Sequence, residues 1–349
     1  MLGMNIGIDL GTTSIIIYVE GKGIVVSEPS AIAYDTETGE IIAVGKKAYD
    51  MYEKNPDSIY VIRPLKDGVI SDFTATLHIL RWYLNKIMGN KILKPNIIVC
   101  VPSGVTGLEK RTILDLVTAS GAGRACLMEE PLAAAIGAGL DIHNPVGAMV
   151  VDIGGGTTDI AVISMGNVVS SASVRGAGNA FDEAVKNYLK KERNVITGNK
   201  TAENIKIKIG CAMFRQDEVT MLAQGKNYIS NLPVYFEISS TEVFLAMSDG
   251  LAEITEGIKK VLEMTSPDLM NDLYQRGIIV TGGGALIPGI DKFIEDQTGI
   301  KTRCAEDSLN CVAMGTGLAI KDMDFLMNNG YVFKTREEIK GYNELDDLS

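Results

Sequence analysis

Two segments of the chain repeat one order of residue types that suits phosphate binding. Residues 5–14 read Asn-Ile-Gly-Ile-Asp-Leu-Gly-Thr-Thr-Ser, and residues 150–159 read Val-Val-Asp-Ile-Gly-Gly-Gly-Thr-Thr-Asp. In each, an apolar β-rich run ends in an acid, and a glycine turn with hydroxyl side chains leads into a second apolar run, which predicts a β-hairpin. Glycine lets backbone N–H groups converge on an anion, because no Cβ blocks the approach. The pattern therefore predicts two phosphate-binding turns.

The candidate phosphate ligands are the turn glycines and the neighbouring hydroxyl residues Gly11, Thr12, Thr13, Ser14, Gly154, Gly155, Gly156, Thr157 and Thr158. Asp9 and Asp152 end predicted buried strands, where an unpaired carboxylate is costly, and hydrated Mg²⁺ bound to phosphates would remove that cost. One such hairpin alone is equally consistent with an ordinary glycine turn. The recurrence favours two related half-molecules that face one another across a nucleotide. The chain has neither a P-loop motif nor a Gly-x-Gly-x-x-Gly after its first strand.

The elements that must position these residues alternate between strand and helix patterns in both halves. The first half predicts strands at 5–19, 23–26, 31–35, 41–44, 97–101 and 125–128, a loop at 63–68, and helices at 46–54, 73–88 (capped by Asp72), 109–120 and 132–140. The second half predicts strands at 148–163, 168–174, 219–238 and 277–281, and helices at 180–192, 201–210, 241–264, 286–297 and 313–321. We expect one helix and a frayed acidic end in the tail 322–349.

Composition restricts the possible partners. The 349 residues carry a net charge of −11, which argues against nucleic-acid binding through a basic surface. Five cysteines without a C-x-x-C pair, with only two histidines, do not predict a zinc site, and we expect reduced thiols. We find no signal peptide and no apolar run of about 18 residues, so no membrane-spanning helix is expected.

Three further segments are candidates for nucleotide chemistry, each with a simpler alternative. Glu130 follows a predicted buried strand and precedes a helix, where a carboxylate can hold water near a phosphate; spacing alone favours Glu129 and Glu130 as ordinary first-turn acids. Residues 281–284, Thr-Gly-Gly-Gly, would let backbone approach an adenosine or simply join a strand to a helix. Glu203 and Lys206 could bind ribose hydroxyls or form a surface ion pair, which is the better interpretation of that pair alone.

The chain resembles the actin-like ATPases, and most closely the MreB/Mbl family of bacterial actins. The resemblance covers roughly residues 4–320 and is carried by segments in family order: Gly7-Ile-Asp-Leu-Gly-Thr12, Gly21-Lys-Gly-Ile-Val-Val-Ser-Glu-Pro-Ser30, Ile62-Arg-Pro-Leu-Lys-Asp-Gly-Val-Ile70, Glu129-Glu-Pro-Leu-Ala-Ala-Ala-Ile-Gly137, Val150-Val-Asp-Ile-Gly-Gly-Gly-Thr-Thr158, Thr201-Ala-Glu-Asn-Ile-Lys206 and Gly277-Ile-Ile-Val-Thr-Gly-Gly-Gly-Ala285. The phosphate turns are shared by the whole superfamily. The Glu-Pro-Ser and Arg-Pro-Leu-Lys-Asp-Gly stretches look specific to MreB-like chains.

The resemblance implies an α/β, actin-like (ribonuclease H-like) duplicated ATPase fold of two lobes, each with a mixed sheet flanked by helices. It implies four subdomains: IA at 1–32, 67–144 and 321–349, IB at 33–66, IIA at 145–180 and 241–320, and IIB at 181–240. Glu130 would polarise the attacking water with help from Thr157, and Asp9 and Asp152 would hold Mg²⁺ through water. ATP would contact the residues of both turns together with Gly178, Glu203, Asn204, Ile205, Lys206, Gly282, Gly283, Gly284 and Ala285.

The family also implies partners and a location. Its members polymerise head to tail into paired protofilaments on the inner face of the cytoplasmic membrane and organise cell-wall synthesis through membrane proteins. We therefore expect a cytoplasmic, membrane-peripheral protein that determines cell shape. Ile92 and Leu93 lie between lysines in a predicted loop, which suits insertion into a membrane interface or an ordinary inward-tucked loop.

Departures from the family pattern leave alternatives. Thr12-Thr13-Ser14 stands where the family usually has Thr-Ala-Asn, and Ala177-Gly178-Asn179 where it usually has Gly-Gly-Asp. The first change leans toward a monomeric DnaK-like chaperone ATPase, although the substrate-binding domain of such chaperones is not present here. A hexokinase-like small-molecule kinase would need a sugar site that nothing marks. A paralogue with weak hydrolysis, used as a regulator or motility filament, is a further alternative, and Glu130 and Asp152 argue against lost catalysis.

Overall fold

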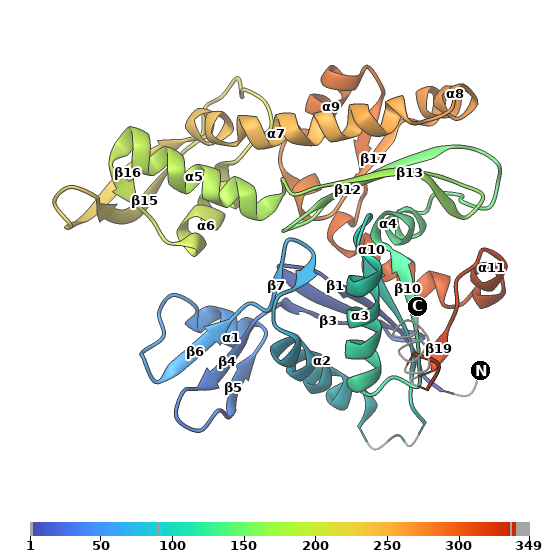
Figure 1. The fold of residues 1–349 in the computed structure, drawn as a ribbon. Helices are drawn as coiled ribbons and strands as arrows, with labels where there is room; N and C mark the ends of the chain where they lie inside the picture. The colour runs from blue at the N-terminus through green and yellow to red at the C-terminus, as the bar shows by residue number, and fades with distance from the viewer. Residues whose placement is uncertain (1–2, 90, 92, 336, 340–349) are drawn as a thin grey trace. The chain divides into compact units, whose positions relative to one another are not determined.

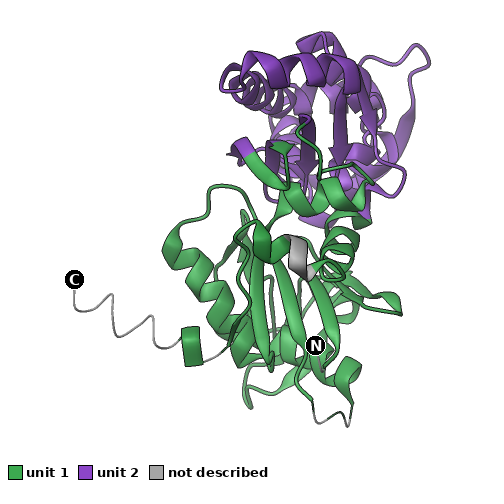
Figure 2. Ribbon diagram, turned by 90° about the vertical axis from the view of Figure 1, so that its right-hand side faces the viewer, with its two compact units in different colours: residues 1–145, 163–168, 310–349 green, residues 146–162, 169–309 purple. Residues whose placement is uncertain are grey.

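The computed structural model describes residues 3–89, 91, 93–335 and 337–339. The chain forms two compact units, shown in different colours in Figure 2. Unit 1 comprises residues 1–145, 163–168 and 310–349, and unit 2 comprises residues 146–162 and 169–309. Each unit is built around its own mixed sheet.

The sheet of unit 1 has six strands in the order β19-β10-β9-β1-β2-β3. The strands are β1 (Asn5–Leu10), β2 (Ser14–Val19), β3 (Gly23–Pro29), β9 (Asn96–Val101), β10 (Arg124–Glu129) and β19 (Lys334–Thr335). β1, β9 and β10 run parallel to one another, whereas β2 is antiparallel to both of its neighbours, β1 and β3. All six residues of β9 are buried, which confirms the prediction of a central parallel strand covered on both faces.

Helices cover both faces of this sheet. One face packs against α2 (Phe73–Met88) and α3 (Gly107–Ala119), which contact each other (Figure 1), through Ile79 of α2 and Leu116 of α3. Asp72 accepts a hydrogen bond from the Ala75 N–H at 2.8 Å, so the predicted cap of α2 is confirmed. The other face carries α10 (Cys311–Ala319), which contacts β1 and α4 (Glu130–Gly137).

A second, three-stranded sheet in unit 1 contains β4 (Ile32–Asp35), β5 (Ile41–Val44) and β6 (Ile59–Ile62), with α1 (Lys46–Met51) against it. Its small core is mostly alanine: Ala31, Ala33, Ala43, Ala48 and Val61. The segment predicted as a loop at 63–68 is instead part of a two-stranded ribbon of β7 (Leu65–Lys66) and β8 (Val69–Ile70). The sequence pattern missed this ribbon because two-residue strands show too little alternation. It also missed β6, although β6 is as long as the predicted strands β4 and β5.

The main sheet of unit 2 has the order β13-β12-β11-β17-β18. Its strands are β11 (Ala148–Ile153), β12 (Thr158–Ser164), β13 (Asn167–Val174), β17 (Ile278–Thr281) and β18 (Thr302–Cys304). β17 is parallel to both β11 and β18. A separate sheet contains β14 (Val195–Ile196), β15 (Thr220–Asn227) and β16 (Pro233–Ser239). Both predicted glycine hairpins are therefore present, one at the centre of each main sheet.

The helices of unit 2 are α5 (Gly178–Arg193), α6 (Asn199–Ile209), α7 (Ser240–Glu263), α8 (Pro267–Arg276) and α9 (Ile290–Thr298). The long helix α7 (Figure 1) buries residues at helical spacing, including Val243, Met247, Leu251 and Ile254. The predicted helix at 286–297 was wrong at its start, because Pro288 and a left-handed Gly289 (φ 81°) separate a 3₁₀ turn at Gly283–Leu286 from α9. Helix α8 was not predicted.

The later part of the chain returns to unit 1. α10 packs against α4 and β1 there, whereas the four-subdomain division placed residues up to 320 with the second half. That division into IA, IB, IIA and IIB otherwise stays a prediction. α11 (Met323–Asn328) is the helix expected in the tail, and residues 340–349, which include most of the acidic end, lie outside the described residues.

Candidate functional site

The two hairpin turns have the same backbone hydrogen bond. The Gly11 N–H donates to the Ser14 carbonyl at 3.0 Å, and the Gly154 N–H donates to the Thr157 carbonyl at 2.9 Å. In both turns the acid, Asp9 or Asp152, stands two residues before the donating glycine. The sequence repeat therefore corresponds to a repeated local geometry.

The turn of unit 1 is held by donors from neighbouring loops. Ser30 donates through its hydroxyl to the Gly11 carbonyl at 2.7 Å and through its N–H to the Thr13 carbonyl at 3.0 Å. The Gly68 N–H donates to the Thr12 hydroxyl at 2.9 Å. The two Ser30 bonds engage carbonyl oxygens of the turn, the groups that would repel a phosphate. They also connect the turn to two stretches that look specific to MreB-like chains.

Asp9 and Glu130 lie at the same edge of the unit 1 sheet. β1 and β10 both run parallel to β9, and Asp9 and Glu130 stand at or just after the carboxyl ends of their strands. Glu130 is the first residue of α4 and is only 9% exposed. Burial distinguishes Glu130 from a solvated first-turn acid, and the N-terminus of α4 favours its negative charge.

The position of α4 depends on a close crossing with α10. A Cβ on Gly315 would overlap the carbonyl oxygen of Ala133, and a Cβ on Gly137 would overlap the carbonyl oxygen of Cys311. On the same helix, a Cβ on Gly317 would overlap the ring of Tyr18 in β2. Glycine at these positions lets α10 contact both the helix that carries Glu130 and the hairpin.

We expect Gly315→Ala to lower the free energy of unfolding by about 1–3 kcal/mol, because the added methyl group meets rigid backbone rather than a movable side chain. Urea denaturation followed by circular dichroism measures the change. Gly107→Ala in α3 is the matched control, since a Cβ there meets nothing within 4 Å. Equal stability of the Gly315→Ala variant and the wild type would contradict the close crossing.

Asp152 is a buried acid of unit 2 with a strongly shifted pKa. Its side chain is 6% exposed and accepts a hydrogen bond from the Thr281 hydroxyl at 2.7 Å. Burial, with a smaller contribution from Asp159, raises the pKa of Asp152 to about 7, and the Thr281 bond opposes this shift. Asp159 is itself fully buried on β12. The sequence prediction gave Asp159 no role, although an acid within the apolar run of β12 could have indicated a buried functional residue.

Folding therefore raises the pKa of Asp152, so the folded nucleotide-free protein holds a proton that the unfolded chain releases. This stabilising contribution is fully present below the ordinary pKa of 3.8 and is lost as the pH rises to about 7. As the pH rises from 3.8 to about 7, we expect the titration of Asp152 to lower the free energy of unfolding by up to about 1.4 kcal/mol for each pH unit. Urea unfolding at pH 5, 6 and 7, compared with Asp152→Asn, measures it. The same pH dependence in both proteins would contradict the assignment.

The predicted adenosine segment packs directly on the end of β11. A Cβ on Gly282, which has φ 76°, would overlap the Ile153 carbonyl oxygen, and a Cβ on Gly284 would overlap the Ile153 side chain. The Gly282 N–H donates to the Ser308 carbonyl at 2.9 Å. Residues 281–284 are therefore more than a loose strand–helix turn, because their glycines permit backbone contact beside Asp152.

The start of α5 contacts the second glycine turn. The Gly178 N–H donates to the Gly154 carbonyl at 3.1 Å, and the Asn179 N–H donates to the Gly155 carbonyl at 2.8 Å. Lys206 of α6 donates to the Gly178 carbonyl at 3.0 Å and forms an ion pair with Asp182 at 2.8 Å. The structure thus brings Gly178 and Lys206 to the turn, as a shared site requires.

The remaining residues of the α6 segment differ in exposure. Glu203 is half-buried and Asn204 is exposed, whereas Ile205 is fully buried in the core of unit 2. The Ile205 side chain fills the core, so the predicted contact of this residue with ATP would have to be made by its backbone. Its backbone is the part that a ligand could reach.

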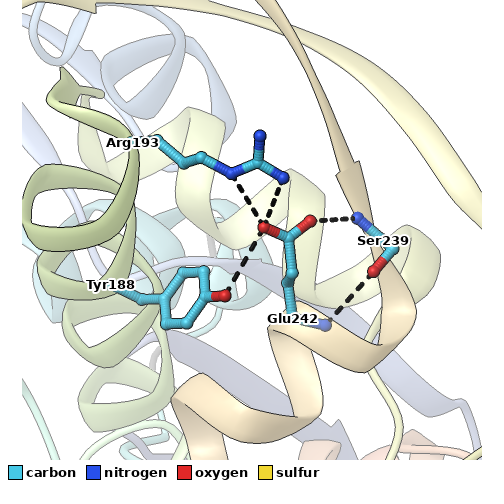
Figure 3. Close-up of polar contacts among 4 residues, drawn as sticks. All are labelled: Tyr188, Arg193, Ser239 and Glu242. Carbon is cyan, nitrogen blue, oxygen red and sulfur yellow. Dashed lines mark hydrogen bonds and ion pairs between the residues drawn. The ribbon is translucent and has the colours of Figure 1, made fainter.

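The other end of α5 is fixed to α7 by a polar network (Figure 3). Glu242 accepts from Arg193 Nε at 2.9 Å and Nη2 at 2.7 Å, and its other oxygen accepts from the Ser239 N–H at 3.0 Å. Tyr188 reaches the same carboxylate at 3.5 Å, and burial raises the pKa of its phenol. Sequence analysis missed this capping box, although Ser239-Ser-Thr-Glu242 has its spacing. The network holds α5 against α7 and so supports its N-terminal contact with the turn.

The donor set of the turns fits a hydrated cation. Among the described residues, no three His, Cys, Asp or Glu side chains are grouped closely enough to hold a metal ion by themselves. Within each unit, the carboxylate beside the glycine turn, Asp9 or Asp152, is of the type that binds Mg²⁺ through water, because Mg²⁺ keeps several waters and shares phosphate oxygens. The raised pKa of Asp152 shows that its negative charge is unfavourable where it is buried, and a nearby cation would stabilise that charge.

The predicted membrane residues are only partly described. Ile92 lies outside the described residues, and Leu93 is 56% exposed. Across the part of the chain that the structure describes, no helix combines the length and apolar character needed to cross a membrane.

Comparison with known proteins identifies the class first. The fold is actin-like: two crystal structures of MreB5 from Spiroplasma citri, each 39% identical in sequence, superpose with TM-scores of 0.87 (AMPPNP-bound) and 0.89 (ADP-bound). They cover 95% and 94% of this chain and 99% of theirs. A family model described as MreB/Mbl protein matches residues 3–328. The chain belongs to the MreB/Mbl family.

Two curated relatives agree with this assignment. The cell shape-determining protein Mbl of Bacillus subtilis (strain 168) is 44% identical over 329 residues, which cover 93% of this chain and 98% of that protein. The cell shape-determining protein MreB of Escherichia coli (strain K12) is 42% identical over 340 residues, which cover 95% and 97%. The resemblance to this family is therefore confirmed, and the chaperone-type and kinase alternatives are not favoured.

Proposed function

We propose that this chain binds ATP with Mg²⁺ and hydrolyses it. The observation that carries the proposal is the repeated turn, in which a glycine N–H bonds to the carbonyl three residues later beside a strand-end acid. Support comes from the AMPPNP and ADP in the structures of MreB5, a relative with 39% identity. GTP is the alternative nucleotide, and a binding measurement with both would distinguish it from ATP.

The candidate site residues have different roles according to their position. The turn amides and hydroxyls at 11–14 and 154–158 bind phosphate oxygens, and Gly178, residues 203–206 and residues 282–285 form the adenosine side. Asp9 and Asp152 would hold hydrated Mg²⁺, which would supply positive charge to neutralise the phosphates. Glu130 accepts a hydrogen bond from the attacking water and holds it in line, with Thr157 assisting. Burial of Glu130 at the start of α4 fixes the position from which its carboxylate acts.

We further propose that the chain polymerises head to tail into paired protofilaments and determines cell shape by organising cell-wall synthesis. Membership of the MreB/Mbl family and the names of its relatives support this role. The protein would be cytoplasmic and peripheral at the inner membrane face, with membrane proteins of cell-wall elongation as partners. The exposed Leu93 supports contact of its loop with the membrane interface.

Glu130→Ala is expected to keep ATP binding but slow phosphate release by about 100-fold or more, because the attacking water loses its orienting carboxylate. A nucleotide-binding titration and a single-turnover phosphate assay measure the two effects separately. Glu129→Gln, one residue earlier on the same turn of chain, is the control and should release phosphate as the wild type does. Unchanged hydrolysis in Glu130→Ala would remove Glu130 from this role.

Filament formation is tested by pelleting across protein concentrations with ATP and Mg²⁺, with light scattering and electron microscopy alongside. A critical concentration and double filaments are the expected result, since cooperative assembly leaves a constant soluble pool. A soluble monomer that hydrolyses ATP, both with and without lipid vesicles, would contradict the filament proposal.

A further inference from the structure

An ion pair largely shielded from solvent joins α5 to α6 beside the second glycine turn. Asp182 Oδ1 lies 2.8 Å from Lys206 Nζ, and the two side chains are 12% and 13% exposed. In contrast, the neighbouring pair Glu183–Lys186 on α5 is a surface pair, with Glu183 57% exposed. A buried charge is costly without its counter-charge, so Asp182 and Lys206 restrict each other's position.

Lys206 also contacts the first residue of α5. Its Nζ donates to the Gly178 carbonyl at 3.0 Å. A Cβ on Gly178 would lie 3.4 Å from Lys206 Nζ, 3.4 Å from the Gly154 carbonyl oxygen and 3.5 Å from the Gly155 Cα. The lysine and the turn therefore surround Gly178 so closely that a single added Cβ would touch both.

The N-terminal amides of α5 complete the connection. Such amides are commonly available for an anion, but those of Gly178 and Asn179 donate to the carbonyls of Gly154 and Gly155. A continuous series of contacts thus runs from Asp182 through Lys206 and Gly178 to the turn. A glycine turn has wide backbone freedom, so its shape must be set by neighbours of this kind.

We infer that Asp182 is a positioning residue: by holding Lys206 against Gly178, it fixes the second glycine turn in the shape that binds phosphate. The inference rests on the proposed ATP binding. It gives Lys206 a role different from a direct ligand of the ribose, since its ammonium group is already paired with the Asp182 carboxylate and donates to the Gly178 carbonyl. Because the turn already has its binding shape, less conformational entropy is lost when the nucleotide binds.

The test uses the full chain and compares ATP, ADP and AMP, measured by competition against a fluorescent ATP analogue. In Asp182→Asn, affinity for ATP and ADP should fall by about tenfold or more, which is the usual effect of losing a residue that orients a ligand-binding group. Affinity for AMP should change little. Asp182→Glu, which keeps the charge, should recover part of the loss. Glu183→Gln is the matched control on the same helix and should bind all three nucleotides as the wild type does.

A second variant avoids leaving one charge buried alone. Asp182→Asn combined with Lys206→Gln removes both charges, and its loss should again be greater for ATP and ADP than for AMP. Circular dichroism confirms folding of each variant. Affinity equal to wild type in both variants, or an equal loss for AMP and ATP, would overturn the inference, the latter because Lys206 would then be an adenosine-side ligand. A wild type that binds none of the nucleotides would instead overturn the proposed ATP binding.

Discussion

Backbone-to-backbone contact at glycine is the constraint on which both halves of the structure depend. In unit 1, α10 approaches α4 so closely that a single added Cβ on Gly315 would overlap the Ala133 carbonyl. In unit 2, Gly282 and Gly284 let the segment after β17 rest on Ile153 at the end of β11. Each contact fixes the element that carries a candidate site residue, Glu130 in one unit and Asp152 in the other. The absence of a side chain at these few glycines therefore controls where Glu130 and Asp152 lie.

Buried charge is the second organising factor. Asp152 and Asp159 lie near one another inside unit 2, and the pKa of Asp152 rises to about 7 as a result. Asp182 and Lys206 offset each other close to the same turn. Carboxylates at such positions lower stability unless a cation or a donor faces them. A phosphate–Mg²⁺ ligand would supply the cation, so the same groups that weaken the nucleotide-free protein favour binding.

Much of the local structure could be predicted from the residues. The two hairpins, the Asp72 cap of α2 and the buried strand β9 all follow from short-range patterns that the structure repeats. The errors have separate causes. The ribbon of β7 and β8 is too short to show a period, and α9 starts late because Pro288 and Gly289 interrupt an apolar pattern. The acid pair Asp152–Asp159 and the ion pair Asp182–Lys206 form between positions that sequence spacing does not connect.

By itself, the sequence predicted the ligand class, because an acid, a glycine turn and hydroxyls in fixed order suit phosphate binding and recur in two segments of about ten residues. It also determined the family, through motifs spread over most of the chain. Only the tertiary structure decided which side chains are available to a ligand. Ile205 fills a core, Lys206 is held by Asp182, and Glu130 is buried rather than solvated. Burial and partnership arise from contacts between distant segments, and no local pattern encodes them.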